Sequence, residues 1–272
     1  MTQQHQHRKH RLVSFYADVI GAERPAALQT LVAPGYVPHV PDFKGIAPLA
    51  RGRDALRVRL AHAGPIPHRV VRLAVDGDIG YAHVRYEGNV PVAGVDVFQF
   101  DEHDHIVQHW NVRQPLPADG ARGEDRFAID LADDTGPPDA KWRQARVRRM
   151  LEELWRPGNA ALVPEYYDRG YIQHNAEMPG GYERIREVVE RDIGRYIEAT
   201  KGPFPIHVHH LGGEHDVVFV HISIFMAGIN RNEGDRSTNV DLFRCDRHGR
   251  MVEHWDVLQI EGVPLPPNAA LF

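Results

Sequence analysis

The sequence predicts an α+β fold in which two similar domains follow each other along the chain. In each half, apolar residues recur first at the 3.6-residue period of helices and then at the two-residue period of strands. A strand–turn–strand pattern occurs twice, as VDVFQFDEHDHIVQHWNVRQ over 95–114 and as VDLFRCDRHGRMVEHWDVLQ over 240–259. The length of 272 residues suits two ordinary domains. Together these observations indicate two domains, each with helices packed on one face of an antiparallel sheet.

The first half opens with helices and continues with strands. One face of an amphipathic helix is formed by residues at positions i, i+3, i+4, i+7 and i+8, namely Leu12, Phe15, Tyr16, Val19 and Ile20. We expect a second short helix over 26–32, an extended segment with several prolines over 36–45, and a third helix over 53–62. Strands are predicted over 68–75 and 79–87, before the hairpin of 95–114. Asp and Gly residues in the connections favour tight turns.

The second half repeats this order. The helix spacing returns 135 residues later at Val147, Met150, Leu151, Leu154 and Trp155, and Tyr171 and His174 repeat Tyr36 and His39 at the same offset. An offset that holds through helix, loop and strand indicates a tandem duplication. We predict a first domain over 1–117, a linker over 118–140 and a second domain over 141–272. The linker is rich in Pro, Gly and Asp, and Phe127, Ile129 and Leu131 could add a short strand to it.

The composition excludes several classes of protein. A net charge of −5 and a pI near 6.4 give no basic surface for nucleic acid or an anionic membrane. The single cysteine, Cys245, excludes an internal disulfide and a cysteine-rich metal site. No apolar run approaches the roughly 20 residues that span a bilayer. The polar N-terminal stretch lacks the apolar core of a signal peptide, so we expect a cytoplasmic protein.

The second strand of the later hairpin carries the first candidate for chemistry. His254 and Asp256 share one face of this strand, because side chains alternate along a strand. An imidazole and a carboxylate on an otherwise apolar strand are costly to bury unless they pair or line a cavity. In the first hairpin the place of Asp256 is taken by Asn111, and an amide cannot exchange protons as a carboxylate does. The candidate acid/base therefore belongs to the second half.

The segments Tyr171-Ile172-Gln173-His174-Asn175, Asp241-Leu242-Phe243-Arg244 and Glu253-His254-Trp255-Asp256-Val257-Leu258-Gln259 resemble the SnoaL-like group of the nuclear transport factor 2-like superfamily. The first half resembles the group in a degraded form. The resemblance implies cone-shaped domains, each a strongly curved antiparallel sheet wrapped around a pocket that about three helices close. The superfamily includes polyketide cyclases, dehydratases, isomerases, epoxide hydrolases and non-catalytic modules. Its members often pair through the sheet, so we expect a pseudo-dimer within the chain, which could form a homodimer.

The resemblance also implies acid/base chemistry without a metal or cofactor. The expected catalytic residues are Asp256, His254, His174, His221 and Asp241. Asp241 is conditional, because the register of the hairpin decides which face it shares. The expected substrate-binding residues are Tyr171, Tyr182, Trp255, His39, His83, Asp96, His109 and Asn111, with the two tyrosines as donors to an enolate oxygen.

The resulting hypothesis is a metal-independent enzyme that acts on a small or medium apolar, carbonyl-bearing molecule. The reaction would be that of a cyclase, isomerase, dehydratase or hydrolase, with secondary metabolism as the expected setting. A non-catalytic ligand-binding or assembly module is the alternative. A third hypothesis is a metal-dependent enzyme, because His207 and His209 share a strand face and His103, His105 and His109 cluster in the first half.

Overall fold

The computed structural model describes residues 2–22, 24–41, 43, 47–116, 126–128, 140–175, 178–225, 236–263 and 265. The chain divides into two compact units, one of Met1–Leu116 with Gly262–Phe272 and one of Pro117–Glu261. Two stretches differ from the expected boundaries. Leu265, expected in the second domain, packs against the core of the first unit, and residues 126–128, expected in the linker, belong to the second unit. Ile129 and Leu131 lie outside the described residues.

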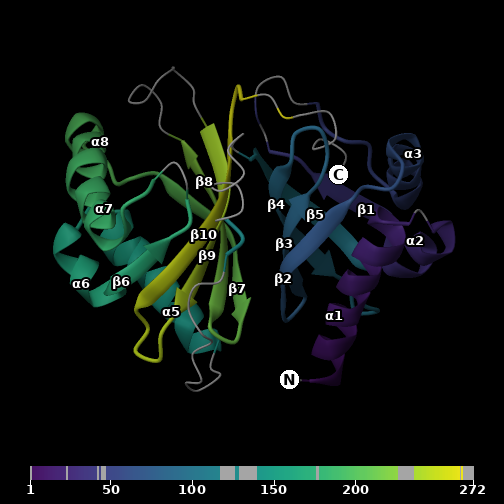
Figure 1. The fold of residues 1–272 in the computed structure, drawn as a ribbon, viewed down its shortest axis with the longest axis horizontal. Helices are drawn as coiled ribbons and strands as arrows, with labels where there is room; N and C mark the ends of the chain where they lie inside the picture. The colour runs from purple at the N-terminus through teal and green to yellow at the C-terminus, as the bar shows by residue number, and fades with distance from the viewer. Residues whose placement is uncertain are drawn as a thin grey trace. The chain divides into compact units, whose positions relative to one another are not determined.

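The first unit packs its helices against one face of a five-stranded sheet (Figure 1). Its elements are α1 (Gln3–Ser14), the π-helical turn η1 (Phe15–Ile20), α2 (Pro25–Leu31), β1 (Val32–His39), α3 (Arg53–Ala63), β2 (His68–Asp76), β3 (Ile79–Tyr86), β4 (Val92–Phe100) and β5 (Ile106–Pro115). The strand order is β1-β5-β4-β3-β2.

The second unit repeats this arrangement. Its elements are α5 (Ala140–Met150), η2 (Leu151–Trp155), η3 (Ala160–Leu162), α6 (Val163–Tyr166), β6 (Tyr167–Gln173), α7 (Gly181–Glu187), η4 (Val188–Ile193), α8 (Gly194–Thr200), β7 (Ile206–Glu214), β8 (Val217–Phe225), β9 (Arg236–Cys245) and β10 (Met251–Ile260). The strand order β6-β10-β9-β8-β7 matches that of the first unit position by position. Within the described ranges, no helix is both long and apolar enough to cross a membrane.

The predicted α+β class with two tandem domains is confirmed, and one strand of each sheet differs from expectation. The sequence predicted four antiparallel strands, whereas β1 and β6 add a fifth that runs parallel to β5 and β10. In the first unit this strand contains Pro34 and Pro38. Proline lacks the N–H group that a central strand needs, so it is tolerated here because β1 lies at the edge of the sheet.

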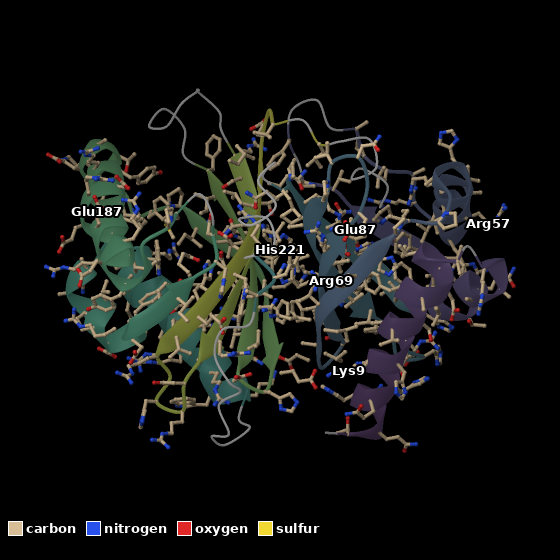
Figure 2. All side chains as sticks on the ribbon, in the orientation of Figure 1. Lys9, Arg57, Arg69, Glu87, Glu187 and His221 are labelled. Carbon is tan, nitrogen blue, oxygen red and sulfur yellow. The ribbon has the colours of Figure 1, made fainter. Side chains whose placement is uncertain are left out.

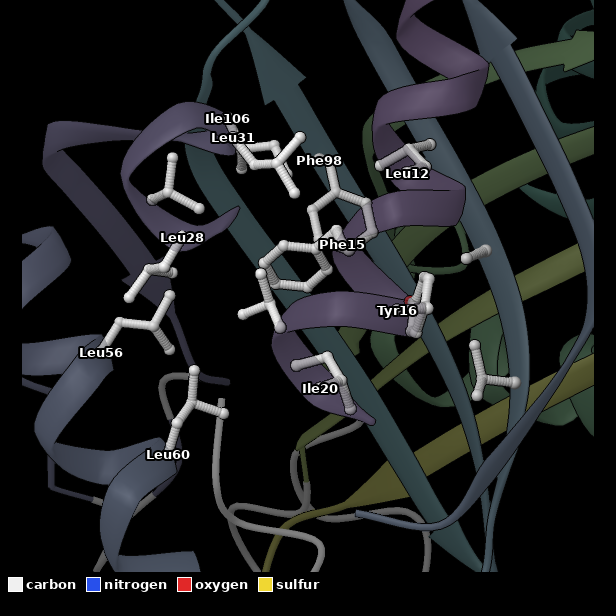
Figure 3. Packing of buried hydrophobic residues seen from close by; sticks show 14 of the residues in the cluster. Leu12, Phe15, Tyr16, Ile20, Leu28, Leu31, Leu56, Leu60, Phe98 and Ile106 are labelled. Carbon is white, nitrogen blue, oxygen red and sulfur yellow. The ribbon is translucent and has the colours of Figure 1, made fainter. Parts of the chain in front are cut away.

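The first helix of each unit packs against the sheet through the apolar stripe that the sequence predicted. In the first unit Leu12, Phe15 and Ile20 are buried against Phe98 of the sheet and against the leucines of α2 and α3 (Figure 3). In both units the stripe ends in a π-helical turn, at Phe15–Ile20 and at Leu151–Trp155. Such turns insert an extra residue into a helix and are frequent at functional sites. Tyr16 and Leu151, which occupy equivalent places in the two turns, both face the inner side of their sheets.

The register of β9 and β10 settles which side chains share a face. Asp256 lies directly opposite Asp241, and His254 lies opposite Phe243. Residues directly opposite each other in an antiparallel pair point to the same side of the sheet. Asp241, His254 and Asp256 therefore all face the helices, and the condition placed on Asp241 is met.

We predict that Gly213→Ala destabilises the second unit. A methyl group at this position of β7 would overlap the carbonyl oxygen of Val217, and backbone atoms cannot move aside cheaply. The expected loss is about 1–3 kcal/mol in the free energy of unfolding, measured by urea denaturation. Gly35→Ala is the matched control, because nothing lies within 4 Å of the added atom there. Equal stability of the two variants would contradict this packing.

Candidate active site

A cavity of about 330 Å³ lies within the second unit, between the inner face of the sheet and its helices. Its helix side is mostly apolar, with Ile185, Val188 and Ile193 from α7 and η4, and it also includes Asp192 of η4. Its sheet side carries the polar groups, including Asp241 and Asp256. A largely apolar cavity with a few convergent polar groups is the usual form of a small-molecule site.

Three buried ionisable side chains meet at the sheet side of this cavity. The Nε2 atom of His254 lies 3.3 Å from Oδ1 of Asp241. One ligand-type atom from each of Asp241, His254 and Asp256 lies within 4.8 Å of the other two. The strand pairing described above fixes this triad on two adjacent strands, so its geometry depends on rigid elements rather than on loops.

Each member of the triad is held by a neutral amide. The Nδ1 atom of His254 lies 2.7 Å from Oε1 of Gln173. Asn239 donates from Nδ2 to both carboxylate oxygens of Asp241, at 3.0 and 3.1 Å. The Nδ2 atom of Asn175 donates to Oδ2 of Asp256 at 2.5 Å. Since the Gln173 oxygen can only accept, Nδ1 of His254 carries a proton and Nε2 faces Asp241.

The pKa of Asp256 is raised above its ordinary value. Burial is the largest cause, because it disfavours the charged carboxylate, and the nearby charge of Asp241 acts in the same direction. His254, Arg126 and the hydrogen bond from Asn175 oppose the shift without cancelling it. The Nη1 atom of Arg126 lies 3.4 Å from Oδ1 of Asp256, a long contact. A carboxyl with a raised pKa is suited to taking up and releasing a proton nearer neutral pH.

Tyr171 places a hydroxyl beside the triad. The residue lines the cavity and is 4% exposed, and the hydroxyl has no hydrogen-bond partner among the described residues. Burial raises the pKa of Tyr171 well above its ordinary value, and the charges of Tyr167, Asp256 and Asp241 add to the effect. The hydroxyl therefore keeps its proton and can donate a hydrogen bond.

Four other residues expected at the site lie elsewhere. His174 and Trp255 stack with ring centroids 5.2 Å apart on the opposite face of the sheet, where His174 also contacts Glu253 at 2.9 Å. His221 lies on β8 (Figure 2). Its side chain alternates out of the cavity because Ile222 and Ile224 point into it, and its Nδ1 atom lies 3.1 Å from that of His210. Tyr182 is buried in the core beneath Arg169 and does not line the cavity.

The equivalent place in the first unit is filled by side chains of the chain itself. Asp96 is 1% exposed and accepts hydrogen bonds from Tyr16 at 2.6 Å, from Tyr86 at 2.5 Å and from Arg113 at 2.6 Å. Nε2 of His109 lies 2.9 Å from the same carboxylate. Burial alone would raise the pKa of Asp96, but Arg113, His109 and Tyr16 lower it below its ordinary value. Asp96 is thus a buried carboxyl with four side-chain partners, and they favour its charged form.

Three substitutions between the halves account for this difference. The positions of Tyr16, Tyr86 and Arg113 are taken in the second unit by Leu151, Ile224 and Leu258, all of which line the cavity. A fourth change accompanies them. Gly94, where a methyl group would lie 2.7 Å from Tyr86 and 2.8 Å from Arg113, has Asn239 as its counterpart.

The remaining first-half candidates make local contacts. His39 stacks on Trp110 with ring centroids 4.5 Å apart, as His174 does on Trp255. His83 contacts Arg72 at 3.1 Å. Asn111 lies opposite Asp96 in the strand pairing and is buried. His109 is the one that shares a contact with the buried carboxylate.

The histidine clusters on which the third, metal-dependent hypothesis rested do not form a metal-binding group in the described part of the chain. The rings of His207 and His209 lie 4.7 Å apart, but His209 hydrogen-bonds Ser223 at 2.9 Å and no carboxylate completes the set. Among the described residues, the group that could hold a metal ion is instead the triad of Asp241, His254 and Asp256.

Sequence reasoning missed the groups that position the triad. Gln173 and Asn175 belong to the segment 171–175 that carries the family resemblance. Their positions on either side of His174 could have marked them as candidate site residues. Asn239 precedes Asp241 by two residues and therefore shares its face. Arg126 gave no signal, because it lies in the stretch interpreted as a linker, yet it is 1% exposed and contacts Asp256.

Comparison with known proteins identifies the family of the first half. Residues 13–109 match the model of the SnoaL-like domain. No curated protein matches the chain. Among solved structures, an NTF-2 like protein of unknown function from Burkholderia xenovorans LB400 is 16% identical, covering 47% of this chain and 99% of its own, with a TM-score of 0.37.

Two further solved structures give similar values. A SnoaL-like protein of unknown function from Burkholderia thailandensis E264 is 16% identical, covering 40% of this chain and 96% of its own, with a TM-score of 0.34. A steroid delta-isomerase from Pseudomonas aeruginosa is 16% identical, covering 45% and 87%, with a TM-score of 0.34. The SnoaL-like match therefore lies within the first unit, and the second unit repeats the strand order of that unit.

Proposed function

We propose that the second unit is a metal-independent acid/base enzyme acting on a small or medium apolar molecule that carries a carbonyl group. The observation that carries this proposal is the position of Asp256, a buried carboxyl with a raised pKa at the wall of a 330 Å³ apolar cavity. Perturbed carboxyls in such cavities are the usual general acids and bases. Cyclisation, isomerisation, dehydration and hydrolysis all need such a group, and secondary metabolism is the proposed setting.

The proposed step is a proton transfer next to the carbonyl. The Asp256 carboxylate removes a proton from the α-carbon, the C–H electron pair becomes a C=C bond, and the carbonyl oxygen takes the negative charge. Tyr171 would donate a hydrogen bond to that oxygen, which would give its hydroxyl the partner it lacks among the described residues. Asp256 then returns the proton to the same or another atom, and this choice decides the product.

His254 and Asp241 would act as a unit beside this base. Gln173 fixes the ring of His254 so that Nε2 points toward Asp241. A proton shared by these two groups would sit within reach of the substrate and could neutralise the developing oxyanion. Because both residues lie on paired strands, their side chains need little rearrangement when charge develops on the substrate.

Asp256→Asn should abolish proton transfer. The variant reproduces the first half, where Asn111 stands at this place. We expect the wild-type protein to accelerate exchange of the α-protons of 2-tetralone for deuterium, and the variant to be slower by about 10²–10⁴-fold. Proton NMR in D₂O measures both rates.

The matched control is Asp54→Asn, because the side chain of Asp54 is 91% exposed on α3. This variant should exchange at the wild-type rate. The proposal is wrong if wild-type protein gives no acceleration, or if Asp256→Asn and Asp54→Asn exchange 2-tetralone equally fast.

The raised pKa of Asp256 also predicts a pH-dependent difference in stability. A group whose pKa is higher in the folded state stabilises the fold while it is protonated, and this contribution is lost as the pH rises through the folded pKa. Asn cannot ionise, so the Asp256→Asn variant should gain stability relative to wild type as the pH rises from 4 to 8. Thermal unfolding of both proteins across this range measures the gain. A difference in Tm that does not change with pH would contradict the shift.

The metal-dependent alternative rests on the same triad and is separable by experiment. Arg126 already places a positive charge 3.4 Å from Asp256, which weakens the attraction of the site for a divalent cation. We therefore expect that dialysis against a chelator leaves the exchange rate of 2-tetralone unchanged. A loss of rate that zinc or manganese restores would favour the metal-dependent enzyme instead.

A further inference from the structure

The first unit shows how this fold neutralises a carboxylate on the inner face of its sheet. Asp96 is bonded by Arg113, which lies over the ring of Tyr86 at 4.5 Å, so the cation sits between an aromatic ring and a carboxylate. Two tyrosine hydroxyls and His109 complete the set. The cation therefore comes from the chain itself, and it reaches Asp96 from β5.

The second unit keeps the carboxylate and has a leucine at the position from which the cation comes in the first unit. Asp241 stands at the place of Asp96, and Leu258 stands at the place of Arg113. Within the described part of the chain, the side chain of Asp241 has two partners, the amide of Asn239 and the ring of His254. Arg126 contacts the other carboxylate, Asp256. A second buried acid thus faces Asp241, and among the described residues no guanidinium contacts Asp241 as Arg113 contacts Asp96.

The space that the guanidinium would fill is open. Leu258, Ile224 and Leu151 are shorter than the residues they replace, and all three line the cavity. The partners of Asp241 are an amide and an imidazole, and a cationic donor makes a stronger, charge-assisted hydrogen bond with a carboxylate than a neutral donor does. The site therefore favours a ligand that brings a positive donor to Asp241.

From this comparison we propose that the ligand of the second unit carries a protonated amine on an apolar body. Its nitrogen takes, beside Asp241, the place that the Arg113 guanidinium takes beside Asp96. Its body fills the volume that Tyr16 and Tyr86 occupy in the first unit. This inference rests on the proposed function, because it names the substrate class of the same cavity: a carbonyl compound with a basic nitrogen.

The ring of Phe243 supports this placement. It packs against His254 with ring centroids 4.6 Å apart and lines the cavity on the strand of Asp241. An ammonium group beside Asp241 would lie near this aromatic surface, as Arg113 lies over Tyr86. Cations are attracted to aromatic faces, so ring and carboxylate favour the same kind of ligand.

Calorimetric titration with three matched bicyclic probes tests the proposal. 2-Aminotetralin carries a protonated amine at pH 7.5, 2-tetralol a neutral hydroxyl, and tetralin neither. We expect 2-aminotetralin to bind at least about ten-fold more tightly than 2-tetralol, as a charge-assisted hydrogen bond predicts. Asp241→Asn should reduce that preference to near one. Equal binding of the three probes by wild type, or a preference that survives Asp241→Asn, would overturn the proposal.

A second variant places an arginine in the second unit at the position that corresponds to Arg113. Leu258→Arg copies Arg113 into the second unit and should weaken binding of 2-aminotetralin at least about ten-fold. Leu258→Met is the matched control, because it keeps an apolar side chain of similar volume and should keep the amine preference. A Leu258→Arg protein that folds and still binds 2-aminotetralin at the wild-type affinity would contradict the proposed position of the nitrogen.

These outcomes are independent of the proposed chemistry. Binding of 2-aminotetralin requires no proton transfer, and exchange of 2-tetralone requires no amine. Exchange without amine preference would leave the acid/base enzyme standing and remove the amine. Amine preference without exchange would leave a binding module for apolar amines.

Discussion

A carboxylate on the inner face of a sheet must be neutralised, and this constraint shapes both halves of the protein. Moving an unpaired charge from water into an apolar interior is far more costly than losing one hydrogen bond. The first half meets the constraint with its own side chains, since Arg113 and two tyrosines bond Asp96. In the second half, His254 and Asn239 contact Asp241, and the raised pKa of Asp256 favours its neutral form.

The two solutions use one framework. Both units have the same strand order, the same parallel edge strand and a π-helical turn at the end of the first long helix. The difference between the two sites lies in a few side chains on that framework. Large polar residues at Tyr16, Tyr86 and Arg113 fill the first pocket, and aliphatic ones open the second. Two units with one framework can in this way hold one filled site and one incompletely satisfied site.

Much of the fold could be predicted from the sequence because it depends on periodicity. The apolar stripe that begins at Leu12 predicted a helix, and the two hairpin patterns predicted strands. Their recurrence predicted that the second half repeats the order of the first. The edge strand β1 was missed as a strand because its prolines argue against a central position, and only the folded sheet shows that it lies at an edge.

The site was predictable where alternation decides it and not where long-range packing does. His254 and Asp256 were placed on one face from the strand period, and the register then added Asp241. His174 and His221 were expected beside them, but the same alternation turns their side chains to the opposite face once the pairing is known. Arg126 contacts Asp256 although the two residues are 130 positions apart in the sequence, and no local pattern predicts such a contact.

Asp96 in the first unit and Asp256 in the second are buried on the inner faces of equivalent sheets, and their pKa values are shifted in opposite directions. Carboxyl-carbon NMR of the protein labelled at aspartate, followed from pH 2 to 9, measures these shifts directly. We predict that Asp256 titrates above the ordinary range for aspartate, whereas Asp96 stays charged until well below it. If Asp96 and Asp256 titrate together near the ordinary aspartate pKa, the contrast between a filled and an open pocket does not control their chemistry, and the proposed base is wrong.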